Sequence, residues 1–260
     1  MPSIITRGAM SARGFGFGYK AAGVAAGSQS YTTPGTYTWV APAGVTSVSV
    51  VAIGGGGKSA SVYSTQGGGG ALGYKNNYSV TPGTSYTVVV GSGAYAGSCT
   101  AGDSYFVNTS TVKGGAGRSY CRTVATFVGD GGGNGGLGGC TCVCTCITGG
   151  GGGAGGYSGA GGNGFRGVFS TPGTCGSGGG GAGGNQGGSG GGVGISGGQG
   201  SNGSYPRGGG SGGTSGSGIN GGSYGGGGAG GSSSAGGAGA VRLVWPGATR
   251  QFPSTCVGSP

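Results

Sequence analysis

The stretch Gly129-Asp130-Gly131-Gly132-Gly133-Asn134-Gly135-Gly136-Leu137-Gly138-Gly139 opens the part of the chain that decides its fold. It begins residues 129–240, where 56 of 112 residues are glycine and only Asp130, Arg166 and Arg207 are charged. Each glycine loses more backbone freedom on ordering than any other residue, and inside a helix it costs about 1 kcal/mol relative to alanine. The stretch is therefore either disordered or folded in a packing that only glycine fits.

The overall composition excludes several protein classes. Glycine supplies 83 of 260 residues, but there is no Gly-X-Y period and there are only nine prolines, which excludes collagen. No apolar run approaches the roughly 18 residues of a transmembrane helix. Residues 1–8 reach only two apolar residues before Arg7, so we expect no secretory signal and no Sec export.

The residue types that the chain lacks also limit its chemistry. It has no histidine and no glutamate, and Asp103 and Asp130 are its only side-chain carboxylates. General acid–base catalysis, a Ser-His-Asp triad and two-metal carboxylate sites all need residues that are missing. We therefore predict a protein that is not an enzyme and has no cofactor.

The net charge of +10 favours anionic partners in general, but the basic residues are scattered and no five-residue window is rich in them. Only Arg166 and Arg207 lie in the glycine tract, too few for an RGG-type nucleic-acid binder, so no nucleic acid is expected as a partner.

Alternating apolar and hydroxyl residues predict β-structure before the glycine tract, and no segment there reads as helical. The expected strands are residues 37–40, 45–51, 78–80 and 86–90 and, more weakly, 104–107 and 122–128. Residues 81–84, Thr-Pro-Gly-Thr, have the signature of a type II turn, with 86–90 as the return strand.

Residues 240–245 predict a last strand, which needs a ladder partner from the early β-region. The glycine tract would then be an insertion between strands of one domain. The predicted organisation is an N-terminal attachment arm (1–28), a β-sandwich part (29–128), a glycine-rich insertion (129–240) and a closing strand with a C-terminal tail (241–260).

Glycine chains can form an extended helix with three residues per turn, and neighbouring helices can pair backbone to backbone because no Cβ keeps them apart. The predicted fold class is therefore all-β, a β-sandwich with an inserted bundle of polyglycine II helices. Disorder is the alternative, but the low charge and the bracketing strands favour order. The larger side chains should then lie in loops at the rim of the bundle: Tyr157, Phe165, Arg166, Tyr205, Arg207 and Tyr224.

The run Cys140-Thr141-Cys142-Val143-Cys144-Thr145-Cys146 would place four thiols on one face of a strand, and four more cysteines stand at 99, 121, 175 and 256. Three interpretations remain open: buried thiols, disulfides in an oxidising setting, and a soft metal bound by Cys140, Cys142, Cys144 and Cys146, whose spacing departs from the usual C-x₂-C. We expect no metal.

Two further segments have both a functional and a structural interpretation. Residues 52–59 fit the loose pattern of a phosphate-binding loop, but no helix-forming sequence follows them, so we do not expect nucleotide binding. In the N-terminal arm, Arg13, Phe15 and Phe17 lie between glycines and are candidates for attachment to a partner; the alternative is an ordinary unstructured terminus.

Segments at both ends of the β-region resemble glycine-rich virion proteins of tailed bacteriophages, especially those of cyanophages and related marine phages. These segments are TYTWVAPAGVTSV (36–48), YKNNYSVTPG (74–83), GDSYF (102–106), GAVRLVWPG (239–247) and RQFPST (250–255). In composition, the glycine tract is similar to the polyglycine sandwich of T-even-type distal tail-fibre adhesins, whose tip loops bind outer-membrane receptors.

The resemblance implies a virion protein, with the N-terminal arm bound to other virion proteins. We predict a tail-fibre or tip adhesin that binds a host surface glycan or outer-membrane protein, with a homo-oligomer possible. The alternatives are a purely structural virion component without receptor binding, and an extracellular glycine-rich or ice-binding protein, although no flat threonine array is present.

Overall fold

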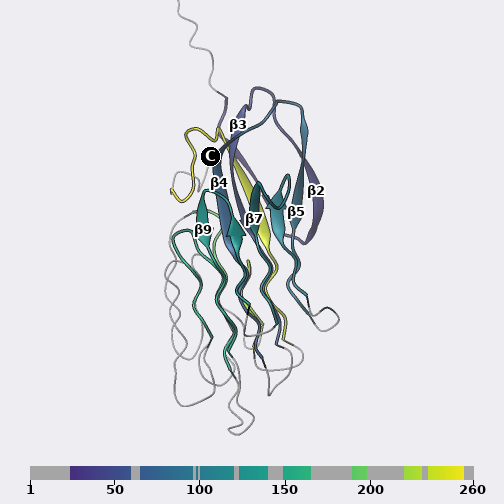
Figure 1. The fold of residues 1–260 in the computed structure, drawn as a ribbon. Helices are drawn as coiled ribbons and strands as arrows, with labels where there is room; N and C mark the ends of the chain where they lie inside the picture. Colours follow the sequence, from purple (N-terminus) through teal and green to yellow (C-terminus); the bar gives the residue numbers. More distant parts are fainter. Residues whose placement is uncertain are drawn as a thin grey trace, which may run out of the picture.

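Ten strands form two antiparallel sheets in the computed structural model (Figure 1), which describes residues 24–59, 65–95, 98, 100–119, 123–139, 149–164, 189–197, 220–229 and 234–254. The first sheet has the order β1 (Gly27–Tyr31), β10 (Ala240–Trp245), β3 (Ser47–Ile53), β4 (Leu72–Ser79), β9 (Gly131–Gly133). The second has the order β2 (Gly35–Val40), β5 (Ser85–Val90), β6 (Ser104–Phe106), β7 (Val112–Gly114), β8 (Phe127–Val128). No helix occurs in these ranges, so the described part of the chain is all-β as predicted.

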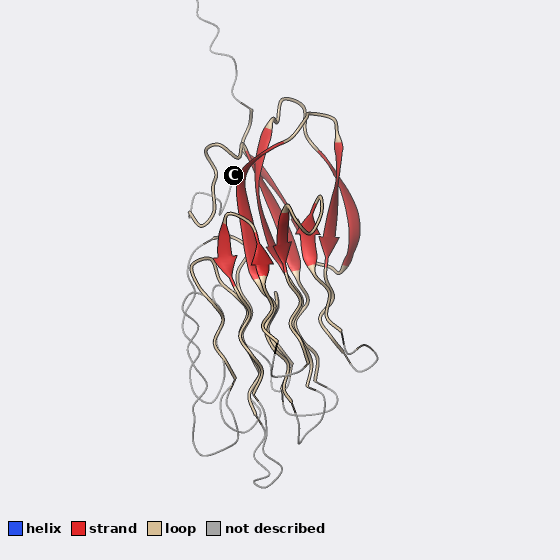
Figure 2. Ribbon diagram, viewed as in Figure 1, coloured by secondary structure: helices blue, strands red, loops and turns tan. Residues whose placement is uncertain are grey.

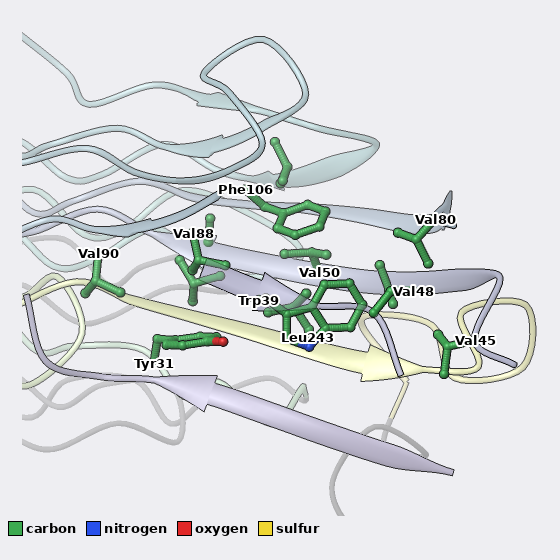
Figure 3. Close-up of a cluster of buried hydrophobic side chains, with 14 residues drawn as sticks. Tyr31, Trp39, Val45, Val48, Val50, Val80, Val88, Val90, Phe106 and Leu243 are labelled. Atoms are coloured by element: carbon green, nitrogen blue, oxygen red, sulfur yellow. The ribbon is translucent and has the colours of Figure 1, made fainter. Parts of the chain in front are cut away.

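The two sheets face each other across one hydrophobic core (Figure 3), formed by alternate residues of their strands. Trp39 of β2 is 1% exposed, and its ring centroid lies 6.0 Å from those of both Phe106 and Trp245. Val50 of β3 and Leu243 of β10 reach the same core from the first sheet. Burial of each such side chain contributes about 1.5–3 kcal/mol, so this core holds the sheets together.

The last strand pairs as the sequence predicts. β10 is hydrogen-bonded to β3 on one side, with Val241 opposite Ala52, and to β1 on the other, with Leu243 opposite Gln29. The expectation of a partner in the early β-region is confirmed. Both ends of the glycine-rich stretch are thereby fixed to the same sheet.

The turn at residues 81–84 is also confirmed, but its role differs from the prediction. The N–H of Thr84 donates to the carbonyl of Thr81 at 3.1 Å, and Gly83 has φ of 78°, as a type II turn requires. The strands on either side do not pair, since β4 lies between β3 and β9 whereas β5 lies between β2 and β6. Residues 86–90 are therefore not a return strand, and the turn connects the two sheets.

Other strand bounds differ from the sequence pattern. Of the expected strand at 122–128, only Phe127–Val128 is found among its described residues, and β1, β7 and β9 were not expected at all. β9 consists of three glycines, so it has no side-chain pattern from which it could be predicted.

The outer face of the first sheet is covered by a second cluster of buried side chains. Val51, Ile53 and Leu72 pack there against Tyr157 from the glycine tract and Phe252 from the segment after β10. This explains why Val50 and Val51, on opposite faces of β3, are both fully buried.

Candidate functional site

Glycine-rich segments continue beyond one end of the strands and lie side by side there (Figure 2). We call them the glycine layer, which comprises residues 54–59, 65–71, 91–94, 115–119, 134–139, 149–156, 189–193, 221–229 and 234–239. Several of these segments come from the region before residue 129, so the glycine layer draws on more of the chain than the glycine-rich tract alone. The end away from the strands is called the far end below.

Hydrogen bonds in the glycine layer repeat every three residues. The amides of Gly54 and Gly57 both donate to segment 65–71, while those of Gly55 and Gly56 between them donate to the carbonyls of Gly102 and Gly237. Segment 65–71 follows the same rule. Its amides at 67 and 70 donate to segment 221–229, and those at 68 and 71 to segment 115–119. Successive residues thus face different neighbours, and these buried amides are satisfied without a regular sheet.

At many glycine positions the spacing between these segments leaves no room for a side chain. A Cβ added to Gly69 would lie 1.9 Å from the carbonyl oxygen of Gly153, and one added to Gly55 would lie 2.1 Å from that of Ser92. Alanine at these positions would force two backbones apart. Glycine is therefore required here by close approach of the backbone.

Residues 52–59, which fit the loose pattern of a phosphate-binding loop, use the backbone amides of their glycines for these hydrogen bonds between segments. All four amides of residues 54–57 donate to backbone carbonyls of other segments at 2.8–3.0 Å. A phosphate would need those N–H groups.

Both side-chain carboxylates of the protein have structural partners. Asp130 accepts from the Lys75 ammonium at 2.9 Å and from the Asn76 N–H at 2.8 Å. Partial burial acts to raise the pKa of Asp130, but these two hydrogen bonds and the charge of Lys75 outweigh it and lower that pKa. Asp103 accepts from the Ala116 N–H at 2.7 Å and lies 3.8 Å from the Lys113 ammonium.

The structure places Tyr157 in the core and not at the rim. It is 2% exposed, its ring stacks on Phe252 at 5.7 Å, and its hydroxyl donates to the carbonyl of Gly194 at 2.8 Å. The prediction of a rim position is wrong for Tyr157, because the uncovered face of the first sheet offers a large apolar side chain a place to be buried.

Tyr224 is half-buried, with φ of 62°, and packs against the same cluster. The remaining predicted site residues lie outside the described residues: Phe165, Arg166, Tyr205 and Arg207; Arg13, Phe15 and Phe17; and Cys140, Cys142, Cys144 and Cys146.

Three residues that the sequence reasoning missed lie at the far end of the glycine layer. Lys58, Tyr95 and Arg118 each follow a glycine-rich segment that continues from β3, β5 or β7. Tyr95 is 55% exposed and Arg118 is also exposed. A signal was available in the sequence, because each is a large polar or aromatic residue directly after a short run of small residues that leaves a strand.

Hydrogen bonds between their neighbours place the backbones of these three positions on adjacent segments. The Ala94 N–H donates to the Gly56 carbonyl at 3.0 Å, and the Gly117 N–H donates to the Gly55 carbonyl at 2.7 Å. The segments that carry Tyr95 and Arg118 therefore both flank the segment that ends in Lys58.

The sequence matches no protein-family model and no curated protein. Within the described ranges, no helix is long and apolar enough to cross a membrane. The same residues contain no group of three or more histidine, cysteine or acidic side chains that could hold a metal ion.

Proposed function

We propose that the glycine layer is a bundle of polyglycine II helices and that the protein is a virion adhesin of a tailed bacteriophage, at a tail fibre or its tip. The three-residue repeat of its hydrogen bonds supports the helices, since polyglycine II has three residues per turn. On this proposal the N-terminal arm, with Arg13, Phe15 and Phe17, binds other virion proteins.

One observation carries the proposal: a scaffold tied together by backbone hydrogen bonds continues the sandwich in one direction and carries the exposed Tyr95 and Arg118 at its end. Binding residues are commonly held on loops by a scaffold that does not itself move. Here the scaffold is tied together by backbone hydrogen bonds, so the residues at its end are free to vary without disturbing a side-chain core. A host surface glycan or outer-membrane protein is the partner that such a surface suits, and no catalytic chemistry is required of it.

Binding of the purified protein to candidate host cells tests this function. We expect saturable binding that is reduced when Phe165, Arg166, Tyr205 and Arg207 are all replaced by alanine. Gln251→Ala, at an exposed position after β10, serves as the control and should bind like the wild type. Folded protein that binds no candidate host would count against the adhesin.

A second candidate, a structural virion component, is favoured by the free edge of β2. Within the described ranges this strand pairs only with β5; it carries no charge and no proline, and it exposes Thr36, Thr38 and Val40. The edges at β8 and β9 have only two and three residues, too short to serve as a good template, and the edge at β1 has five. An unprotected edge of six residues is suited to pairing with a second copy.

Thr38→Lys tests this candidate, because a charge on the edge opposes strand pairing. If the protein is a structural component, its mass in solution should fall from an oligomer to a monomer in this variant. A wild-type protein that is monomeric at high concentration would contradict it.

A further inference from the structure

We infer that Lys58, Arg118 and Tyr95, at the far end of the glycine layer, form a binding site for an acidic saccharide. This inference rests on the proposed adhesin function and names the ligand class for a part of the surface that the sequence reasoning did not identify. Its basis is the distribution of charge over the described residues.

The positive charges of the sandwich are neutralised or buried. Lys75 and Lys113 pair with Asp130 and Asp103, and no side-chain carboxylate then remains anywhere in the chain. Arg242 and Arg250 are 5% and 6% exposed, and their guanidinium groups donate to groups that include the carbonyls of Ile195 and Trp245. The other charges of the described sandwich therefore belong to Arg242 and Arg250, whose side chains are buried, and its exposed surface carries only the two ion pairs.

The far end of the glycine layer, in contrast, carries two cations that are not paired with any carboxylate in the described ranges. Lys58 is half-buried, Arg118 is exposed, and neither belongs to the two ion pairs of the described residues. Because both acidic side chains are already engaged, no further side-chain carboxylate is left to neutralise these two cations. Their field is available to an anionic ligand.

The geometry of the layer places Tyr95 beside Lys58. A Cβ on Gly55 would point at the carbonyl of Ser92, and the hydrogen bonds of this segment repeat every three residues. Lys58, three residues after Gly55, is therefore directed toward the segment that ends in Tyr95. The exposed ring is fixed at its backbone, because Tyr95 and Ser98 exchange hydrogen bonds at 3.0 and 2.9 Å.

This combination suits a sugar that carries carboxylate, sulfate or phosphate groups. An exposed tyrosine offers an apolar ring face to a sugar and a hydroxyl to its polar edge. The lysine and arginine attract the acidic groups, and arginine can bind an oxyanion through two parallel hydrogen bonds. A neutral sugar would use only the ring, and a simple polyanion would use only the cations.

Three probes separate these contributions: dextran sulfate, neutral dextran of the same length, and inorganic polyphosphate. We expect the wild type to bind dextran sulfate and not dextran. Lys58→Gln with Arg118→Gln should weaken that binding about tenfold and flatten its salt dependence. Tyr95→Ala should weaken binding of dextran sulfate about fivefold and leave polyphosphate binding unchanged.

Lys75→Gln with Lys113→Gln is the matched control, because it removes the same two charges from the sandwich. An equal loss in both double variants would overturn the inference, since net charge alone would then explain binding. Equal loss of polyphosphate and dextran sulfate in Tyr95→Ala would overturn the choice of a saccharide.

Binding of the same variants to host cells separates this inference from the proposed function. If the wild type and the Lys58/Arg118 variant bind cells equally well, the adhesin stands and this site is wrong. If the wild type binds dextran sulfate through these residues but binds no cells, the site stands and the proposed function fails.

Discussion

At the scale of single residues, the absence of a Cβ in glycine allows packing and backbone conformations that other residues do not allow. Gly69 is positioned against a carbonyl of a distant segment at a spacing that excludes a methyl group. Gly83 has a different requirement, a positive φ with nothing within 4 Å of an added Cβ. Glycine is therefore required at position 69 by the close approach of another backbone, and at position 83 by the backbone conformation.

We expect Gly69→Ala to lower the free energy of unfolding by about 2 kcal/mol or more, because the methyl group must push two backbones apart. Gly83→Ala should cost roughly 1 kcal/mol, the penalty of positive φ for a residue with a side chain. Denaturant unfolding of both variants measures the difference. Equal losses would contradict a closely packed glycine layer.

Tyr157 gives the fold a dependence on alkaline pH. Burial raises its pKa above the ordinary 10.0, although the N–H of Gly197 and the charge of Arg242 partly oppose this. A raised folded-state pKa contributes stability that is complete below the unfolded pKa and is lost as the pH rises above it. We expect the unfolding free energy to fall above about pH 10.

Tyr157→Phe keeps the ring packing and removes the titrating group, so it should lose part of this alkaline decline. It should also cost about 1 kcal/mol at neutral pH, through loss of the hydrogen bond to Gly194. Unfolding measured from pH 7 to 11 compares the two proteins. Identical pH profiles would show that Tyr157 is not buried as described.

At the scale of elements, the segment after β10 acts as a cover for the first sheet. Asn76 of β4 holds it in place, since its side chain donates to the Phe252 carbonyl at 2.8 Å and accepts from the Phe252 N–H at 2.9 Å. The Phe252 ring then fills the outer cluster beside Tyr74 and Tyr157. The segment after β10 is therefore held both by hydrogen bonds to Asn76 and by packing of the Phe252 ring.

Phe252→Ala should destabilise the protein by about 3 kcal/mol through the cavity it leaves. Asn76→Ala should cost about 1–2 kcal/mol, because two backbone groups lose their partner. Gln251→Ala, at the exposed neighbouring position, should change stability by less than about 0.5 kcal/mol. Thermal unfolding measures the stability of the three variants. An equal loss of stability in Gln251→Ala and Phe252→Ala would contradict the proposal that this segment covers the first sheet.

Prediction from the sequence succeeded where the side chains mark a strand. β3 was found because hydroxyl and apolar residues alternate along it, β2 and β5 because they are rich in β-branched and aromatic residues, and β10 because it is a short, mostly apolar run closed by Pro246-Gly247. β9 and the glycine layer have no such side-chain pattern, so neither their bounds nor their neighbours could be predicted. The buried position of Tyr157 was missed for a related reason, since nothing in the sequence marks which face of which strand lacks a cover.

At the scale of the whole molecule, the protein combines two ways of holding a fold together. The sandwich uses a hydrophobic core, while the glycine layer uses backbone hydrogen bonds between segments from many parts of the chain. The low charge of the glycine tract and the strands that bracket it favoured order over disorder, but they did not indicate which segments pair, because glycines are interchangeable in sequence. The proposed far-end site depends on this layer being rigid.

Hydrogen exchange of the backbone amides tests this rigidity most directly. We predict that the amides of residues 54–57, 67–70 and 152–155 exchange as slowly as those of β3 and β10, because they donate to backbone carbonyls of neighbouring segments. Exchange of these glycine amides at the rate of an unstructured chain, while β3 and β10 stay protected, would contradict it.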